Sequence, residues 1–429
     1  MWNDDNNKKS ALGLTMVEKI LSRHAGKIVK KGEICIADID FAFGQDGTSS
    51  VIIDSFREMG VEKVFDKNKC AIILDHSCPS PIVGVSNIHK KIREFVKETG
   101  IILHDIGDGV CHELVPAKGY VKPGDLVLGA DSHTCTYGAL NMCSTGMGST
   151  DVAAAMIAGK TWLKVPETIK FIANGKLKKG VYSKDLILYL IGQVSADGAT
   201  YKACEYTGEA IDDLSIEARM TICNMAIEMG AKFGIMNFDK KLETWLEKKG
   251  IKDYKKVESD DNAEYLKIYE YDASSITPMV AMPHTVDNVA SINDVKGTHI
   301  DEAYLGTCTN GRIEDLTIAA NILKGKKINK NVRFIVAPAS REIYLEAMEK
   351  GLIKIFVEAG AAVVSPGCGC CVGTHNGVPS DGENVISTAN RNFKGRMGNN
   401  KAFIHLASPA TVVSSAIEGK IADPREHLD

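Results

Sequence analysis

The sequence lacks the features of a membrane-spanning, secreted or nucleic-acid-binding protein. No apolar run approaches the ~20 residues that a membrane-spanning helix needs. The first ten residues, MWNDDNNKKS, have neither the basic start nor the apolar stretch of a signal peptide. We expect them to be a frayed extension before a domain that begins near Leu12. The formal net charge is only −4, so we expect no nucleic-acid and no membrane partner, and a cytoplasmic location.

The length and composition are those of a globular chain with several domains. At 429 residues the chain suggests two or three domains, and 44% hydrophobic with 25% charged residues is ordinary for a soluble protein. There is no internal repeat or low-complexity segment. The pattern changes near 160–180 and again between about 250 and 300. We therefore predict domains over residues 1–160, 161–285 and 286–429.

Short apolar runs alternate with helical patterns along the chain. The runs at 71–75, 126–131, 303–306 and 332–337 are predicted strands. Helices are predicted over 86–98, before Gly100, and over 314–324, before Gly325. This alternation predicts α/β domains with largely parallel sheets, in which ligands gather at the carboxyl ends of strands.

Chemically capable residues follow three of the predicted strands. Those at the three strand ends are, in turn, Asp75 and His76; Asp131, Ser132 and His133; and Thr307, Cys308, Thr309 and Asn310. Any one of these groups could simply cap a helix or form a turn. Because three strand ends carry such residues, we expect them to build one shared site.

Three of the twelve cysteines stand out from the rest. The cysteines are too widely spread for the disulfide framework of a small secreted domain, and the default for each is a small buried hydrophobe. Cys308 lies in GTCTNG, however, and Cys368 and Cys371 form a C-x-x-C pair in PGCGCCVG. Zinc, disulfide-redox and iron–sulfur sites all use such a pair.

The number of cysteines favours an iron–sulfur cluster over zinc. A structural zinc site needs four Cys or His ligands, usually in two close pairs, whereas here one pair joins a single distant cysteine. Three cysteinates would leave one iron of a cubane cluster open as a Lewis acid. Cys370 could replace either neighbour; we choose Cys368 and Cys371 because two intervening residues let both side chains reach one cluster.

Two further segments carry candidate ligand-binding residues. In NRNFKGR at 390–396, Arg391 and Arg396 flank a turn, and guanidinium groups bind carboxylates through a bidentate fork. A solvated basic loop is the alternative. In 215–230, a predicted helix between Ser215 and Gly230, Asn224 and Glu228 are four residues apart and would share one face. Surface decoration is the alternative there.

Taken with GADSHTCTYGAL at 129–140 and TICNMAIEMGA at 221–231, these motifs resemble the aconitase superfamily. They occur in the family's order and spacing, and the resemblance runs from about Leu12 to Ile421. Within the superfamily the chain is similar to the large subunits of isopropylmalate dehydratases. The resemblance implies three layered α/β/α domains around a 4Fe–4S cluster.

The resemblance also assigns roles to residues of this sequence. Cluster ligands match Cys308, Cys368 and Cys371, and the histidine–carboxylate pairs match His76 with Asp75, His112 with Asp131, and His133 with Glu228. Ser132 joins the catalytic set, and substrate-contacting positions match Asn224, Asn390, Arg391 and Arg396. Departures occur at DHSCPSP, residues 75–81, and at Cys370, and they leave the exact substrate open.

The activity that the resemblance implies is hydro-lyase chemistry on a branched 2-hydroxy-dicarboxylic acid. 3-Isopropylmalate is the expected substrate, with homocitrate, 2,3-dimethylmalate or citramalate as alternatives. No swivelling domain follows before Asp429, so a separate small subunit is the expected partner and would supply the catalytic base. Of other classes, a zinc module leaves the strand-end motifs unexplained. An RNA-binding regulator conflicts with the net charge and with the lack of a basic stripe.

Overall fold

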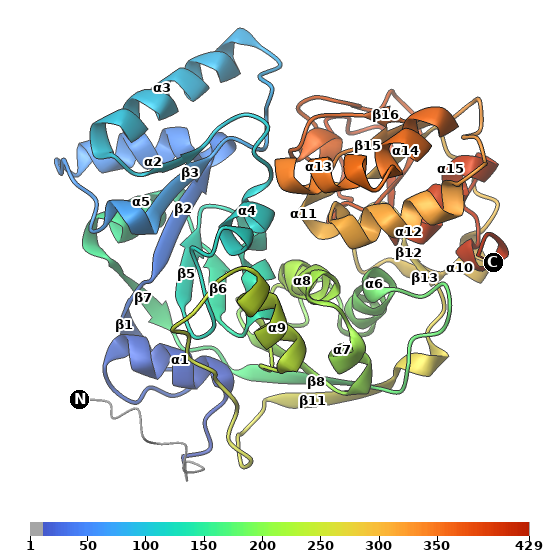
Figure 1. Cartoon of the computed structure of the whole chain (residues 1–429). Helices are drawn as coiled ribbons and strands as arrows, with labels where there is room; N and C mark the ends of the chain where they lie inside the picture. Colours follow the sequence, from blue (N-terminus) through green and yellow to red (C-terminus); the bar gives the residue numbers. More distant parts are fainter. Residues whose placement is uncertain (1–11, 429) are drawn as a thin grey trace.

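The computed structural model describes residues 12–428 and arranges their strands in three large sheets and one two-stranded ribbon. The expected extension at residues 1–10 lies outside the described residues. Figure 1 shows the first sheet with its helices on the left, the third on the right and the second below them. Within residues 12–428, no helix has both the length and the apolar character needed to span a bilayer.

The first sheet has five parallel strands in the order β4-β3-β2-β5-β6. Its strands are β2 (Phe41–Gln45), β3 (Cys70–Ile73), β4 (Ile102–His104), β5 (Leu126–Gly129) and β6 (Cys143–Gly146). Its helices are α1 (Met16–Ala25), α2 (Asp46–Glu58), α3 (Val83–Thr99), α4 (Cys111–Ala117) and α5 (Ser149–Ala158). The predicted strands at 71–75 and 126–131 are confirmed as β3 and β5. The helix predicted before Gly100 is α3, and Gly100 ends it in the left-handed conformation.

The second sheet is also parallel, in the order β10-β9-β8-β11. Its strands are β8 (Thr168–Asn174), β9 (Ala203–Thr207), β10 (Phe233–Met236) and β11 (Lys267–Asp272), and its helices are α6 (Ser183–Val194), α7 (Glu209–Asp213), α8 (Ile216–Asn224) and α9 (Lys240–Lys248). An antiparallel ribbon of β1 (Ile34–Asp38) and β7 (Lys160–Lys164) precedes it.

The third sheet has seven strands in the order β13-β12-β18-β17-β14-β15-β16, and only the pairs that involve β12 are antiparallel. Its strands are β12 (Met279–Ala281), β13 (Val289–Ser291), β14 (Glu302–Leu305), β15 (Arg333–Val336), β16 (Ala362–Val363), β17 (Asn384–Ser387) and β18 (Phe403–Leu406). Its helices are α10 (Ile292–Val295), α11 (Thr307–Asn310), α12 (Ile313–Leu323), α13 (Arg341–Glu349), α14 (Leu352–Ala359) and α15 (Pro409–Glu418). This sheet begins with β12, ahead of the boundary that we placed at 286.

Six short 3₁₀ helices complete the described elements: η1 (Lys67–Lys69), η2 (Ser132–Leu140), η3 (Met225–Met229), η4 (Ala273–Ser275), η5 (Gly369–Val372) and η6 (Pro424–Glu426). One of them corrects a prediction. The segment 215–230 is not a single α-helix, because α8 ends at Asn224 and η3 continues the chain to Gly230. Ser215 does cap α8, accepting the backbone N–H of Ala218 at 3.0 Å.

The apolar core joins the three sheets. The largest cluster of buried side chains takes members from all of them, including Phe41 and Tyr137, Phe171 and Tyr206, and Tyr304 and Met397. Full burial of each such side chain contributes about 1.5–3 kcal/mol. The α/β class is confirmed, and the shared core packs the carboxyl ends of β3, β5 and β14 close enough to build one site.

Candidate active site

The residues at the three strand ends meet in a single small cavity. Nine of the predicted site residues line it, together with Thr307 and Val372: His76, His112, Asp131, His133, Cys308, Cys368, Cys371, Asn390 and Arg396. The other predicted residues do not line the cavity. Of these, Asp75, Asn224, Glu228 and Arg391 make hydrogen bonds to residues that do or to one another, whereas Ser132 only follows Asp131 along the chain.

The three predicted ligand cysteines face this cavity from two segments. Cys308 lies in α11, directly after Thr307, whose φ of 74° is a left-handed conformation that a β-branched residue rarely adopts. Cys368 directly precedes η5, and Cys371 is the third residue of that helix. All three side chains are 3–5% exposed. A strained residue therefore precedes Cys308, and the short helix η5 positions both Cys368, at its N-cap, and Cys371, within it.

Cys370 differs from Cys368 and Cys371 because it is fully buried and does not line the cavity. Gly369 sets this turn. Its φ is +59°, and a Cβ there would come within 2.4 Å of the Tyr304 hydroxyl oxygen, which donates to the carbonyl of Cys368 at 2.8 Å. The packed glycine thus fixes the backbone between Cys368 and Cys370.

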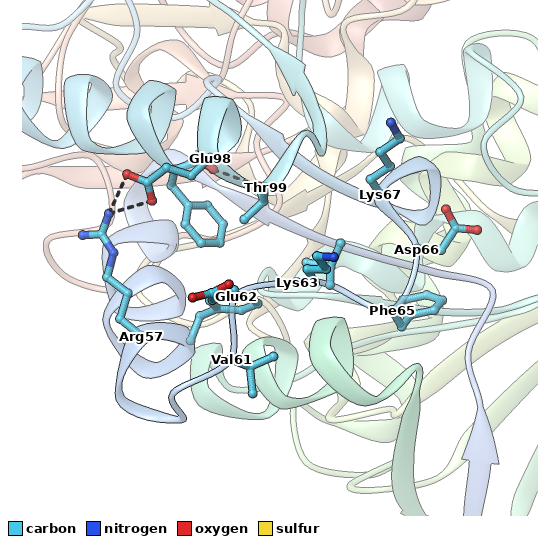
Figure 2. A pocket seen from close by; sticks show the side chains of 12 residues that line it. Arg57, Val61, Glu62, Lys63, Phe65, Asp66, Lys67, Glu98 and Thr99 are labelled. Carbon is cyan, nitrogen blue, oxygen red and sulfur yellow. Dashed lines mark hydrogen bonds and ion pairs between the residues drawn. The ribbon is translucent and has the colours of Figure 1, made fainter.

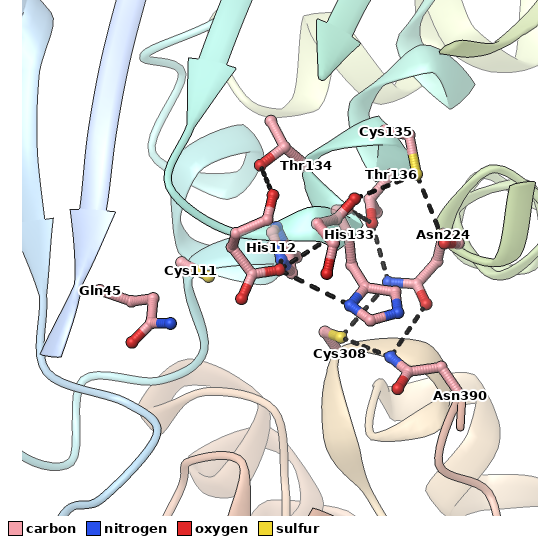
Figure 3. A network of polar contacts seen from close by, with 12 residues as sticks. Gln45, Cys111, His112, His133, Thr134, Cys135, Thr136, Asn224, Cys308 and Asn390 are labelled. Carbon is pink, nitrogen blue, oxygen red and sulfur yellow. Dashed lines mark hydrogen bonds and ion pairs between the residues drawn. The ribbon is translucent and has the colours of Figure 1, made fainter. Parts of the chain in front are cut away.

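Hydrogen-bond donors point at the cysteine sulfurs. The Nδ2 atoms of Asn224 and Asn390 lie 3.3 and 3.5 Å from Cys308 Sγ, and Arg396 Nη2 lies 3.6 Å from Cys371 Sγ. Figure 3 shows the two amides beside Cys308. Burial raises the pKa of Cys308 to about 12, so this thiol is neutral unless a cation takes the place of its proton. Buried sulfurs that accept several N–H groups are suited to act as metal-bound thiolates.

The histidines form a network centred on Asp131. Nε2 of His76 lies 3.2 Å from Asp131 Oδ2, while Nε2 of His112 and Nδ1 of His133 lie 2.8 and 3.6 Å from Asp131 Oδ1. The pairs of His76 Nδ1 with Asp75 Oδ1 at 2.7 Å and of His133 Nε2 with Glu228 Oε1 at 2.8 Å complete it. The three pairs named from the sequence are therefore in contact. In addition, Asp131 contacts all three histidines.

Burial and neighbouring charges shift the pKa values of His76, His112 and Asp131 in different directions. Burial lowers the pKa of His76, but Cys368, Asp75 and Asp131 outweigh it and raise that pKa well above its usual value. Burial lowers the pKa of His112, and Asp131 only partly opposes it. Although burial favours its neutral form, the histidines hold the pKa of Asp131 well below its usual value. One carboxylate thus stands between a cationic and a neutral imidazole.

Two arginines extend the site. Arg391 Nε donates to both oxygens of Glu228, at 2.8 and 3.1 Å. Arg396 reaches the cavity, and its Nε is buried without a hydrogen-bond partner among residues 12–428. Because an unpaired buried donor is costly, that atom is a candidate to bind an anionic ligand.

A larger cavity, of about 730 Å³, lies elsewhere in the first domain, between α2, α3 and the segment 61–67. Figure 2 shows its rim, where Arg57 and Glu98 bond to each other at 3.1 Å. It contains no histidine or cysteine, and none of the predicted residues lines it. The candidate active site is therefore identified by the reactive side chains that line the smaller cavity, not by cavity volume.

Asp46, which follows the carboxyl end of β2, is a further residue of the site that we did not predict from the sequence. Its carboxylate is 3% exposed and holds the backbone of residues 75–77. The same rule that selected the other three strand ends would have found it, had 41–45 been recognised as a strand. That run, FAFGQ, contains a glycine and is too short to show a pattern.

Comparisons with known proteins agree with this geometry. A profile of the aconitase family (aconitate hydratase) matches residues 18–299 and 291–419. The 3-isopropylmalate dehydratase large subunit of Elusimicrobium minutum is 51% identical over 96% of this chain and 99% of its own length. Large subunit 1 of the same enzyme from Thermotoga maritima is 51% identical over 97% of this chain and 100% of its own length.

A relative with another name and a solved structure are also similar to this chain. A probable methanogen homoaconitase large subunit of Methanosarcina mazei is 50% identical over 91% of this chain and its own full length. The crystal structure of aconitase X from Thermococcus kodakaraensis, in its holo form, shares the fold with a TM-score of 0.50 at 13% identity, covering 83% of this chain and 84% of that one. From the family profile and from relatives that match almost end to end, we conclude that this chain belongs to the aconitase family.

Proposed function

We propose that the chain is the large subunit of a hydro-lyase that removes water from, and returns it to, a branched 2-hydroxy-dicarboxylic acid. 3-Isopropylmalate is the proposed substrate because the relatives at 51% identity are named for it. The observation that carries the proposal is one cavity lined by three cysteines, three histidines and an arginine with an unpaired donor. Homocitrate is the second candidate, because a relative at 50% identity is named a probable homoaconitase large subunit.

Cys308, Cys368 and Cys371 are proposed to hold a 4Fe–4S cluster. Their fit to such a group is supported by three buried sulfurs along one cavity, from which Cys370 is absent, and by amide and guanidinium donors aimed at two of them. A structural zinc site would need one further Cys or His ligand, usually paired closely with Cys308, whereas the three histidines that line the cavity are each paired with an acid. When bound, a cluster with one iron free of cysteine supplies a Lewis acid that polarises the substrate hydroxyl.

His76 is the proposed proton donor to the leaving hydroxyl. Carboxylate oxygens of Asp75 and Asp131 lie 2.7 and 3.2 Å from its two ring nitrogens, and they stabilise the protonated imidazole. His112 and His133, each paired with an acid, are proposed to order the water that leaves and returns. Ser132 follows Asp131 but does not line the cavity, so it has the weakest support of the catalytic set.

The substrate carboxylates are proposed to bind the two arginines and two asparagines. Arg396 supports this role through its unpaired Nε, and Arg391 through a guanidinium that Glu228 orients by way of Nε. Asn224 and Asn390 bond to each other, Oδ1 to Nδ2, at 3.3 Å and present their amides beside Cys308. Positive charge at this position would also oppose the negative charge that develops on a carboxylate as the carbon-bound proton leaves.

A separate small subunit is the proposed partner. The histidines that line the cavity are already paired with acids, so no lining side chain is left to take the carbon-bound proton. The relatives' names specify large subunits, which implies that a second chain exists for them. Apolar side chains within seven residues in sequence of residues that line the cavity are well exposed, namely Ile82 at 65%, Val83 at 77%, Val378 at 45% and Phe393 at 48%.

A substrate panel tests the proposal. The chain would be purified without oxygen, mixed with its cognate small subunit, and assayed with isopropylmalate, homocitrate, citramalate and dimethylmalate. We expect a broad absorption band near ~400 nm and the highest kcat/KM with isopropylmalate. Preference for homocitrate would support the second candidate. Stoichiometric zinc together with the absence of this band would overturn both the proposed 4Fe–4S cluster and the proposed function.

A further inference from the structure

One buried lysine in the second domain has no carboxylate within ion-pair distance among residues 12–428. Lys184, near the start of α6, is 0% exposed. No carboxylate oxygen of residues 12–428 lies within 4.0 Å of its Nζ, and the oxygens of the adjacent Asp185 accept the backbone N–H groups of Tyr182 and Met279 instead. A buried ammonium without a close partner is costly, so the charged form of Lys184 would be favoured by negative charge on nearby groups.

The lysine binds the segment that leads into the candidate active site. Its Nζ donates to the backbone carbonyls of Thr388 at 3.0 Å and Ala389 at 2.6 Å, at the end of β17. Asn390 follows directly, with its Nδ2 3.5 Å from Cys308 Sγ and its Oδ1 3.9 Å from Cys371 Sγ. Figure 3 shows Asn390 beside Cys308. The anchored backbone at Ala389 is therefore directly followed by Asn390, whose side chain contacts two of the cysteines.

The groups that act on this lysine are those of the active site. Burial lowers the pKa of Lys184 to about 7, and Cys371, Cys308, Glu228 and Asp315 oppose that effect in this order. The two groups that raise the pKa of Lys184 most are cysteines, which become negative when they bind metal. Ionised thiolates would thus favour the ammonium form.

We propose that Lys184 is a positioning residue of the cysteine site: its charge balances the metal-bound thiolates, and its two hydrogen bonds fix the backbone that carries Asn390 and Arg391. This inference rests on the proposed cluster. It adds that the second domain, which provides no cysteine ligand, supplies a buried positive charge to the cluster in addition to that of Arg396. The lysine itself touches no ligand sulfur by hydrogen bond and is not a catalytic residue.

Two substitutions separate the charge from the hydrogen bonds. Lys184→Gln keeps an N–H donor but removes the charge, and Lys184→Met removes both. Both are expected to lose iron to a chelator under anaerobic conditions at least about 10-fold faster than the unmodified chain, because ~1.4 kcal/mol of stabilisation corresponds to a factor of ten. The reduction potential of the cluster should also become more negative, since removal of a nearby positive charge disfavours the added electron.

Lys232→Gln is the matched control. Lys232 is partly buried in the same domain, and its Nζ also donates to a backbone carbonyl, that of Gly146 at 3.1 Å, away from the cysteines. It should leave the rate of iron loss and the potential unchanged. Far-ultraviolet circular dichroism of each variant without cluster tests folding, and Lys184→Gln carries the test if Lys184→Met does not fold.

The outcomes distinguish this inference from the proposed function. If the unmodified chain shows no cluster absorption, the proposed function fails first. If it holds a cluster, and Lys184→Gln keeps that cluster with unchanged iron loss and potential, the inference about Lys184 is overturned. Loss in both Lys184 variants, but not in Lys232→Gln, supports it.

Discussion

The carboxylate of Asp46 holds the backbone of His76 in place: its Oδ1 accepts the N–H of His76 at 2.8 Å. The same carboxylate accepts the N–H groups of Asp75 at 3.2 Å and Ser77 at 2.8 Å, and His89 Nε2 lies 3.2 Å from it. His89 and the backbone donors at 76 and 77 hold the pKa of Asp46 at about 2 although burial alone would raise it. The first residue of α2 thus fixes the loop that presents the proposed proton donor.

Asp46→Asn should reduce kcat/KM by at least about 10-fold. Both carboxylate oxygens accept hydrogen bonds, so either orientation of the amide would place an N–H group against a donor. The loss of a charged acceptor should also lower stability by about 1.5–3 kcal/mol. Asp54→Asn, on the same helix but 57% exposed, is the control and should change neither quantity. An active, equally stable Asp46→Asn enzyme would show that the loop holds His76 without this carboxylate.

The cysteine assignment predicts a specific pattern of cluster loss. Serine at position 308, 368 or 371 should abolish the visible absorption and the activity, because each of these side chains lines the cavity. Cys370→Ala should keep both, since Cys370 is fully buried and does not line the cavity, and alanine avoids burying a hydroxyl there. Iron and sulfide analysis of each variant provides the measurement. Retention of the cluster by Cys371→Ser together with its loss in Cys370→Ala would reverse the assignment.

Several features of the site were predictable because they depend on local rules. Strands at 71–75 and 126–131 followed from apolar runs, and their polar ends followed from the behaviour of parallel sheets. The three contacts of Asp131 with histidines did not, because they depend on how η2 packs against α4 and the loop after β3. The turn at Asn224, where α8 becomes η3, was equally hidden. Helical spacing in a sequence does not distinguish an α-helix from a shorter 3₁₀ continuation.

Arg391→Lys should lower kcat/KM by at least about 10-fold, or about 1.4 kcal/mol. Lysine keeps the charge but cannot donate both to Glu228, as Arg391 Nε now does, and through a planar fork to a substrate carboxylate. Arg341→Lys, which alters an exposed ion pair with Asp108, is the control and should have no effect. Steady-state kinetics with the reconstituted two-chain enzyme provides the measurement. An unchanged kcat/KM would mean that Arg391 only shapes its loop.

Asp125 predicts a pH dependence of stability that is separate from catalysis. Burial, and then the nearby Asp40, raises the pKa of Asp125 from 3.8 to about 7, against smaller opposing effects of the Lys122 N–H and of the Lys122 and Arg23 charges. A raised folded-state pKa contributes stability that is complete below pH 3.8 and is lost as the pH rises through about 7. Asp125→Asn should therefore flatten the fall in stability between pH 5 and 7.5, by up to about 1.4 kcal/mol per pH unit.

Urea midpoints across that pH range measure the effect. Asparagine can still accept the Lys122 N–H, which now lies 2.9 Å from Asp125 Oδ2, so the variant should fold normally. Asp381→Asn, at an exposed ion pair with Lys401, is the control and should leave the slope unchanged. Equal slopes for Asp125→Asn and the unmodified chain would mean that Asp125 is already ionised in the folded protein.

The exposed apolar side chains around the cavity predict where the small subunit binds. Phe393 is 48% exposed, and its ring lies 5.9 Å from the guanidinium of Arg396, which lines the cavity. Phe393→Ala should weaken association with the small subunit by about 10-fold or more, since aromatic residues often dominate binding energy at interfaces. The cluster absorption of the isolated chain should not change, because Phe393 is not one of the residues that line the cavity.

Trp162→Ala is the control: Trp162 is 59% exposed, but it lies on the separate β1–β7 ribbon. Titration of the labelled small subunit measures both affinities. If Trp162→Ala weakens binding and Phe393→Ala does not, the partner docks on the ribbon rather than over the site. A missing catalytic base would then have to come from this chain after all.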